Sequence, residues 1–177
     1  MVTLRCTLKL LKRLGLSRLS EPPAPSTALG DWYANIIYVQ RKPLILCVSE
    51  LSLLAVLVPA RELSNLPQRF ERTVRDLLGR LDIPAPVIEK ELAAMSDLAF
   101  GPTRSRSVLG SMNDFIRAIR FLAEDDPDWT LAEMEDQLYI TPCGPLGYDR
   151  PAERTRKLLR EAYESSPLDR LPWRQGR

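Results

Sequence analysis

The sequence contains no histidine. Without an imidazole, serine and cysteine triads with a histidine base are excluded, as are zinc sites with histidine ligands and two-histidine iron sites. Nucleases that depend on histidine are excluded for the same reason. Any catalysis would have to use carboxylates, lysine, tyrosine, arginine or a metal held by oxygen atoms. The composition therefore favours a binding protein over an enzyme, although catalysis that needs no histidine is still open.

Glycine and cysteine are also scarce. The eight glycines form neither a GxGxxG nor a GxxxxGK[ST] motif, so no phosphate-binding loop is indicated. The three cysteines, Cys6, Cys47 and Cys143, lie far apart and form no CxxC pair. This spacing predicts neither a zinc site nor a disulfide framework, and it is typical of a reducing compartment. We expect no cofactor and no metal ion.

No hydrophobic run is long enough to cross a membrane. The most apolar window, residues 51–60, is too short for a bilayer. Basic residues interrupt the leucines of residues 4–14, and no cleavage site of small residues follows, which argues against a signal peptide. These features predict a cytoplasmic protein without a membrane partner.

The chain has 177 residues, 45% hydrophobic and 27% charged, which is typical of a globular protein. We predict one domain over residues 1–164 and a C-terminal tail over residues 165–177. The net charge of +2 is too small to indicate a nucleic-acid partner by itself. Charge is segregated, however, with basic residues in 1–20 and 154–160 and acidic residues in 124–136. Such blocks are either solvated faces or the surface for a charged partner.

Hydrophobic periodicity predicts the fold class. Alternating or continuous apolar residues predict strands at 2–6, 32–39, 44–48 and 53–58, with one buried face at 2–6 and a turn at 41–43. The last two runs are apolar throughout, which indicates central strands. A helical period predicts helices near 8–14, 70–81, 87–95, 108–122, 130–139 and 151–162, and residues 98–100 form a brief extra strand. In the first of these helices Leu8 is expected to face inward and Gly15 to end the helix. The prediction is an α+β fold, in which an antiparallel meander sheet of 3–5 strands in the N-terminal half packs against 4–6 helices in the C-terminal half.

The first candidate site precedes and opens the helix at 108–122. Arg104, Ser105, Arg106 and Ser107 lie where the helix exposes unpaired N–H groups, so the two arginines could fork onto a phosphate or carboxylate. Asn113 and Asp114 lie one to two turns into that helix. The alternative is structural, with Ser105 or Ser107 capping the helix and both arginines solvated.

The second candidate site opens the strand at 32–39. Asp31, Trp32 and Asn35 form a polar and aromatic cluster, and the spacing of four places Asp31 and Asn35 on one face. A ligand site is one interpretation, and a turn that presents Trp32 to the core is the other.

Three blocks carry a resemblance to known sequences. The segments LRCTLKLLK (4–12), LGDWYAN (29–35) and RSVLGSMND (106–114) resemble a family of uncharacterised bacterial proteins that often lie near mobile elements. The resemblance covers most of residues 2–145. It implies no activity and gives no residue a catalytic role.

These observations lead to three functional hypotheses. The first is a non-enzymatic regulator of antitoxin, immunity or defence-accessory type that holds a protein partner. The second is a protein that binds or processes RNA or DNA through the basic N-terminal helix and the 103–107 loop. The third is a metal-dependent phosphoryl-transfer enzyme that uses Asp31, Asn113 and Asp114.

Overall fold

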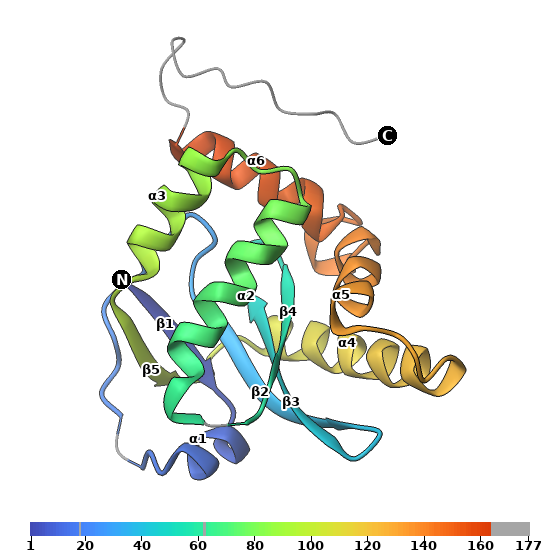
Figure 1. Ribbon diagram of the computed structural model, residues 1–177. Coiled ribbons are helices and arrows are strands. Elements are labelled where there is room, and N and C mark those ends of the chain that lie inside the picture. Colours follow the sequence, from blue (N-terminus) through green and yellow to red (C-terminus); the bar gives the residue numbers. More distant parts are fainter. Residues whose placement is uncertain (18, 62, 164–177) are drawn as a thin grey trace.

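Five strands form one mixed sheet in the order β4-β3-β2-β1-β5 (Figure 1). The structure is a computed structural model that describes residues 1–17, 19–61 and 63–163. The strands are β1 (Val2–Cys6), β2 (Trp32–Val39), β3 (Lys42–Ser49), β4 (Ala55–Pro59) and β5 (Leu98–Pro102). The tail predicted for residues 165–177 lies outside the described residues.

Six α-helices accompany these strands in the described part of the chain. They are α1 (Leu8–Leu14), α2 (Leu66–Arg80), α3 (Ala85–Met95), α4 (Arg106–Asp125), α5 (Leu131–Ile140) and α6 (Pro151–Tyr163), and two short 3₁₀ turns occupy Leu63–Asn65 and Gly144–Leu146. The predicted α+β class is confirmed. Every predicted helix has a counterpart, and so does the brief strand predicted at 98–100.

The antiparallel part of the sheet is the meander β2-β3-β4. The turn between β2 and β3 lies at Gln40 and Arg41 rather than at the predicted 41–43. Both turn residues have positive φ, 46° and 65°, which is the backbone that a two-residue hairpin loop requires. Lys42 and Pro43 therefore already belong to β3.

The prediction of an antiparallel sheet is wrong for β1 and β5, which makes the sheet mixed. β1 runs parallel to β2 on one side and to β5 on the other. Helix α1 connects β1 to β2, and α2 and α3 lie between β4 and β5. Such helical crossovers return the chain to the same end of the sheet, and the next strand is then parallel.

Helices cover both faces of the sheet, so two apolar cores form (Figure 1). Trp32 enters the core under α1, α2, α3 and α6, where its ring meets Phe70 edge to face at 5.1 Å. Tyr33 points to the opposite face, toward the core under α4 and α5. Because successive side chains of β2 alternate between two buried faces, most of the strand is shielded from solvent.

Two predictions about burial are corrected by this arrangement. β1 has both faces buried, not one, and its polar residues Thr3 and Arg5 are inaccessible to solvent. Leu8 is 84% exposed, whereas Leu10 and Leu11 point inward from α1. Gly15 ends α1 as predicted, in the left-handed conformation.

The apolar run in β4 does not belong to a central strand, since β4 is an edge of the sheet. Its side chains alternate between the two cores, which explains the apolar sequence. Part of its outer edge is covered, because the Leu57 N–H donates to Glu135 Oε1 of α5 at 2.7 Å. Glu135 also pairs with Arg80 of α2. Covering of this kind keeps an edge strand from pairing with another chain.

Glu135 gives the protein a predicted pH dependence. Burial raises the pKa of this carboxyl from 4.5 to about 6, although the Leu57 N–H and Arg80 act in the opposite direction. The folded protein keeps this proton up to a higher pH than the unfolded chain does. Ionisation of the buried carboxyl therefore lowers the stability of the fold as pH rises from 4.5 to about 6. Over that range we expect the free energy of unfolding to fall by about 2 kcal/mol relative to Glu135→Gln.

Urea denaturation of both proteins between pH 4 and pH 7 measures this difference. Asp136→Asn is the matched control, because Asp136 contacts the same Arg80 from a more exposed position. A constant difference between wild type and Glu135→Gln across the range would contradict the prediction.

Candidate functional site

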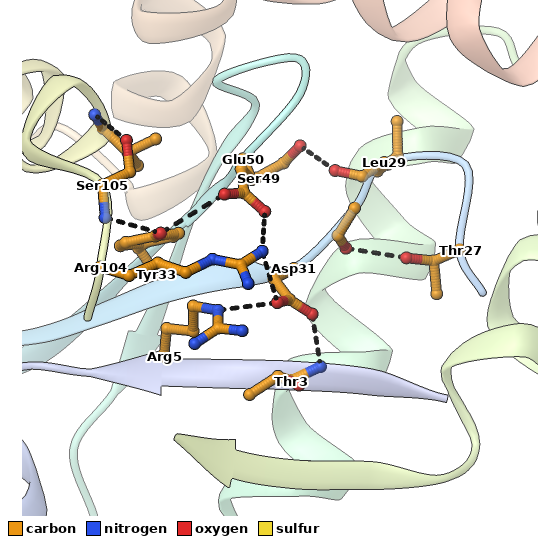
Figure 2. Close-up of polar contacts among 12 residues, drawn as sticks. Thr3, Arg5, Thr27, Leu29, Asp31, Tyr33, Ser49, Glu50, Arg104 and Ser105 are labelled. Carbon is orange, nitrogen blue, oxygen red and sulfur yellow. Dashed lines mark hydrogen bonds and ion pairs between the residues drawn. The ribbon is translucent and has the colours of Figure 1, made fainter. Parts of the chain in front are cut away.

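Asp31 is the centre of a buried polar cluster (Figure 2). Its Oδ1 accepts the backbone N–H of Thr3 at 3.0 Å, and its Oδ2 accepts Arg5 Nε at 2.7 Å. Thr3 and Arg5 are two residues apart in β1, so both side chains lie on one face of the strand. The side chains of Asp31 and Arg5 are both inaccessible to solvent. The result is a fully buried ion pair between β1 and the residue that immediately precedes β2.

The turn before Asp31 is built for close packing. Gly30 has φ of +73°, and a Cβ there would lie 2.9 Å from the Leu51 side chain. The carbonyl of Gly30 accepts the Thr27 hydroxyl at 2.7 Å. The carbonyl of Leu29 accepts the Ser49 hydroxyl at 2.8 Å. Figure 2 shows these bonds holding the loop against the end of the sheet. They fix where Asp31 enters the cluster.

Arg104 joins the cluster from the segment between β5 and α4. Its guanidinium lies 3.3 Å from a Glu50 oxygen, 3.6 Å from Asp31 and 3.6 Å from Glu21, and its side chain is half exposed. Arg5 also reaches Glu21, at 2.9 Å. Two cations thus face three carboxylates, which gives the cluster a formal charge of −1. An anion approaching Arg104 would meet these carboxylates, so the geometry gives little support to an anion site at this residue.

Tyr33 connects the cluster to the start of α4 (Figure 2). The phenol oxygen accepts the backbone N–H of Ser105 at 3.0 Å and lies 3.4 Å from Glu50 Oε1. The Ser105 hydroxyl accepts the Val108 N–H at 3.3 Å, so Ser105 is the N-cap of α4. Burial raises the pKa of Tyr33 above its usual value of 10.0. The phenol therefore stays protonated at neutral pH.

Arg106 and Ser107 lie in the first turn of α4 and are exposed. Neither side chain forms a hydrogen bond or ion pair with the described residues. They differ in this respect from Arg104 and Ser105, which the cluster holds in place. The predicted 103–107 segment therefore divides into Arg104 and Ser105, which the polar cluster holds, and Arg106 and Ser107, whose side chains face solvent.

The remaining predicted residues lie apart from the cluster. Asn113 and Asp114 are on the exposed side of α4, where Asp114 pairs with Arg117. Trp32 is buried in the core, and Asn35 accepts the Thr7 hydroxyl at 2.9 Å. The structure thus does not bring Asp31 together with Asn113 and Asp114, the set that a phosphoryl-transfer enzyme would need. In residues 1–17, 19–61 and 63–163, no three His, Cys, Asp or Glu side chains are placed to hold a metal ion.

The three thiols are poor nucleophiles in these surroundings. Burial raises the pKa of Cys6 to about 12 and that of Cys47 well above 9.0. Burial also raises the pKa of Cys143, and the charge of Asp114 adds to this effect. Because the thiolate is the reactive form, none of the three is activated at neutral pH.

Sequence reasoning missed the partners that complete the cluster, namely Arg5, Glu21, Tyr33 and Glu50. The alternation at 2–6 predicts one buried face, which places Arg5 on the other face from Leu4 and Cys6. Because the structure buries that second face as well, Arg5 requires a partner of opposite charge. The identity of that partner depends on the pairing of β1 with β2, which local patterns do not specify.

No helix in the described part of the chain combines the length and the apolar character that a membrane crossing needs. Residues 3–154 match the model of a family described as Domain of unknown function (DUF6933). The matched span contains the whole polar cluster, and the resemblance to an uncharacterised family is confirmed. No curated protein matches the chain.

Proposed function

The chain belongs to the DUF6933 family, a domain of unknown function, and we propose that it has a binding role without catalysis. In this proposal it is a small cytoplasmic regulator, of antitoxin, immunity or defence-accessory type, that acts by holding a protein partner. The contact surface consists of Glu50, Leu51, Arg104, Arg106 and Ser107, and we call it the 104–107 surface.

The observation that carries the proposal is the mixed charge around Arg104. Three carboxylates surround this arginine, while Arg106 beside it is exposed and unpaired among the described residues. A phosphate backbone would be attracted by Arg106 and repelled by Glu21 and Glu50. A protein surface offers groups of both signs, so it matches this arrangement better than a nucleic acid does.

Rigidity and exposed apolar area also support a protein partner. The polar cluster fixes Arg104 and Ser105, so α4 begins at a defined place and binding would cost little ordering entropy. Leu51, next to Glu50 in the β3–β4 turn, is 45% exposed. Arginine together with an exposed apolar side chain is a common composition for the centre of a protein interface.

Arg106→Glu tests the proposal, because the exposed Arg106 side chain forms no hydrogen bond or ion pair with the described residues. Immobilised wild type and variant are compared in bacterial lysate, with mass spectrometry for proteins and sequencing for nucleic acids. We expect wild type to retain one protein at constant stoichiometry, and the variant to bind the purified partner at least about tenfold more weakly. Arg72→Glu, an exposed arginine of α2, is the matched control and should bind like wild type. All three proteins should melt alike.

Salt dependence separates the nucleic-acid hypothesis from this one. Phosphate contacts make affinity fall steeply between roughly 50 and 200 mM salt, and a protein interface of mixed charge has a shallower dependence. Nuclease-sensitive material that is lost at the higher salt would contradict the proposal. Equal partner affinity in Arg106→Glu and wild type would place the interface elsewhere.

A further inference from the structure

A groove of about 590 Å³ lies at the opposite end of β2 from Asp31. It is bounded by the β2–β3 hairpin, the end of β4, the segment that joins α4 to α5 and the start of α5. Its apolar lining comes from Leu44, Pro59, Pro127, Trp129, Leu131 and Met134. None of these residues belongs to the 104–107 surface, so the groove is independent of the proposed protein interface.

The size and lining of the groove match those of a small-molecule site. Such sites occupy roughly 300–1,000 Å³ and are mainly apolar and aromatic, with few polar groups. The half-buried Trp129 provides a flat ring at the wall. Met134 is buried at the same site, and its flexible thioether adapts to the shape of an apolar guest. The groove therefore fits a flat apolar body.

The charged residues that line the groove indicate the sign of charge that such a ligand would carry. Lys42 opens β3 and Arg61 follows β4, and both line the groove from exposed positions. Neither side chain is paired with a carboxylate of the described residues, in contrast to Arg5, Arg75, Arg80 and Arg104. The acidic side chains of Asp126, Asp128 and Glu133 line a separate hollow that shares only Trp129 with the groove. Among residues 1–17, 19–61 and 63–163, the apolar surface of the groove is thus bordered by two cations that form no ion pair.

We propose that this groove binds a small organic anion with a flat aromatic body, of the aromatic carboxylate or sulfonate class. The body lies against Trp129 and Met134. The negative group lies at the rim, where Lys42 and Arg61 supply the complementary charge.

The test uses two fluorescent probes that differ mainly in charge. 8-Anilinonaphthalene-1-sulfonate is an aromatic anion, and N-phenyl-1-naphthylamine is its neutral counterpart. We expect the folded protein to bind one equivalent of the sulfonate. The double variant Lys42→Ala with Arg61→Ala should weaken sulfonate binding by about tenfold and leave the neutral probe unchanged. Trp129→Ala should weaken both probes.

Matched controls isolate the groove from the rest of the surface. Lys12→Ala with Arg13→Ala removes two exposed cations of α1, and Phe121→Ala removes an aromatic ring that is 69% exposed on α4. Both should bind the probes like wild type. Melting curves with and without probe confirm that the sulfonate binds the folded state. The double variant removes two exposed side chains that form no ion pair with the described residues, so it tests the proposal even if Trp129→Ala does not fold.

Three outcomes would overturn the proposal. One is equal sulfonate binding by wild type and the double variant, and another is fluorescence that rises only as the protein unfolds. The third is failure of both probes to bind, which would leave the groove to an apolar side chain of a partner protein. None of these outcomes affects the Arg106 experiment, so the two proposals fail independently.

Discussion

Replacing Asp31 by alanine should lower the free energy of unfolding by about 3–5 kcal/mol. The reason is the burial of Arg5, whose guanidinium has no access to solvent and takes its closest counter-charge from Asp31. Removal of the carboxylate leaves a buried cation whose remaining partners among the described residues are the exposed Glu21 and the Pro102 carbonyl, and it also removes the acceptor of the Thr3 N–H. Urea denaturation followed by circular dichroism measures the loss.

Two further variants separate the contribution of the buried Asp31 charge from those of the Thr3 hydrogen bond and the exposed Glu21 ion pair. Glu21→Ala removes a carboxylate that contacts both Arg5 and Arg104. Because Glu21 is 59% exposed, the free energy of unfolding should fall by less than about 1 kcal/mol. Asp31→Asn keeps an oxygen for the Thr3 N–H without the charge, so it should recover only part of the stability. If Asp31→Ala were no more costly than Glu21→Ala, the ion pair would not be a main support of the sheet.

Glu91→Ala should lower the free energy of unfolding by about 3 kcal/mol. This carboxylate of α3 is fully buried and accepts the backbone N–H groups of Ala28 and Leu29, at 2.9 and 3.1 Å. It also accepts the Tyr163 hydroxyl of α6 at 2.6 Å. The alanine variant leaves all three donors without their acceptor, and the loop before Asp31 loses its attachment to α3.

Hydrogen exchange distinguishes this local effect from general destabilisation. The amides of Ala28 and Leu29 should exchange faster in Glu91→Ala than in Asp31→Ala at matched stability. Glu89→Ala is the control on the same helix, because Glu89 is exposed and pairs only with Arg75, so stability should change by no more than about 0.5 kcal/mol. Unchanged protection of both amides would contradict the role given to Glu91.

Local patterns in the sequence were sufficient for most elements. The helix predicted at 130–139 begins with Thr130 as the N-cap of α5, in a capping box with Glu133, and the predicted Gly15 ends α1. These features depend on residues within one turn of each other, which is the range over which propensity and capping act. The direction of β1 and β5 depends instead on where the connecting helices pack. No short window of the sequence contains that information.

The candidate site shows the same division between local and distant interactions. Of the two serines that the sequence offers as caps, Ser105 caps α4, and its contact with Val108 is local. Arg104 was expected to be solvated or to bind an anion, yet its carboxylate partners come from residues 54 to 83 positions earlier in the chain. The groove at Trp129 was not predicted for the same reason, since its walls come from a hairpin, a strand end and an interhelical segment. Spacing within a motif cannot reveal neighbours that only the fold brings together.

The position of β1 between β2 and β5 has a consequence for synthesis on the ribosome. Its second neighbour ends at Pro102, so residues 2–6 lack half of their backbone partners until that segment has left the exit tunnel. The β2-β3-β4 meander needs only contacts between adjacent segments and can form earlier. During translation the edge of β1 that later pairs with β5 is therefore open to mispairing and to capture by chaperones.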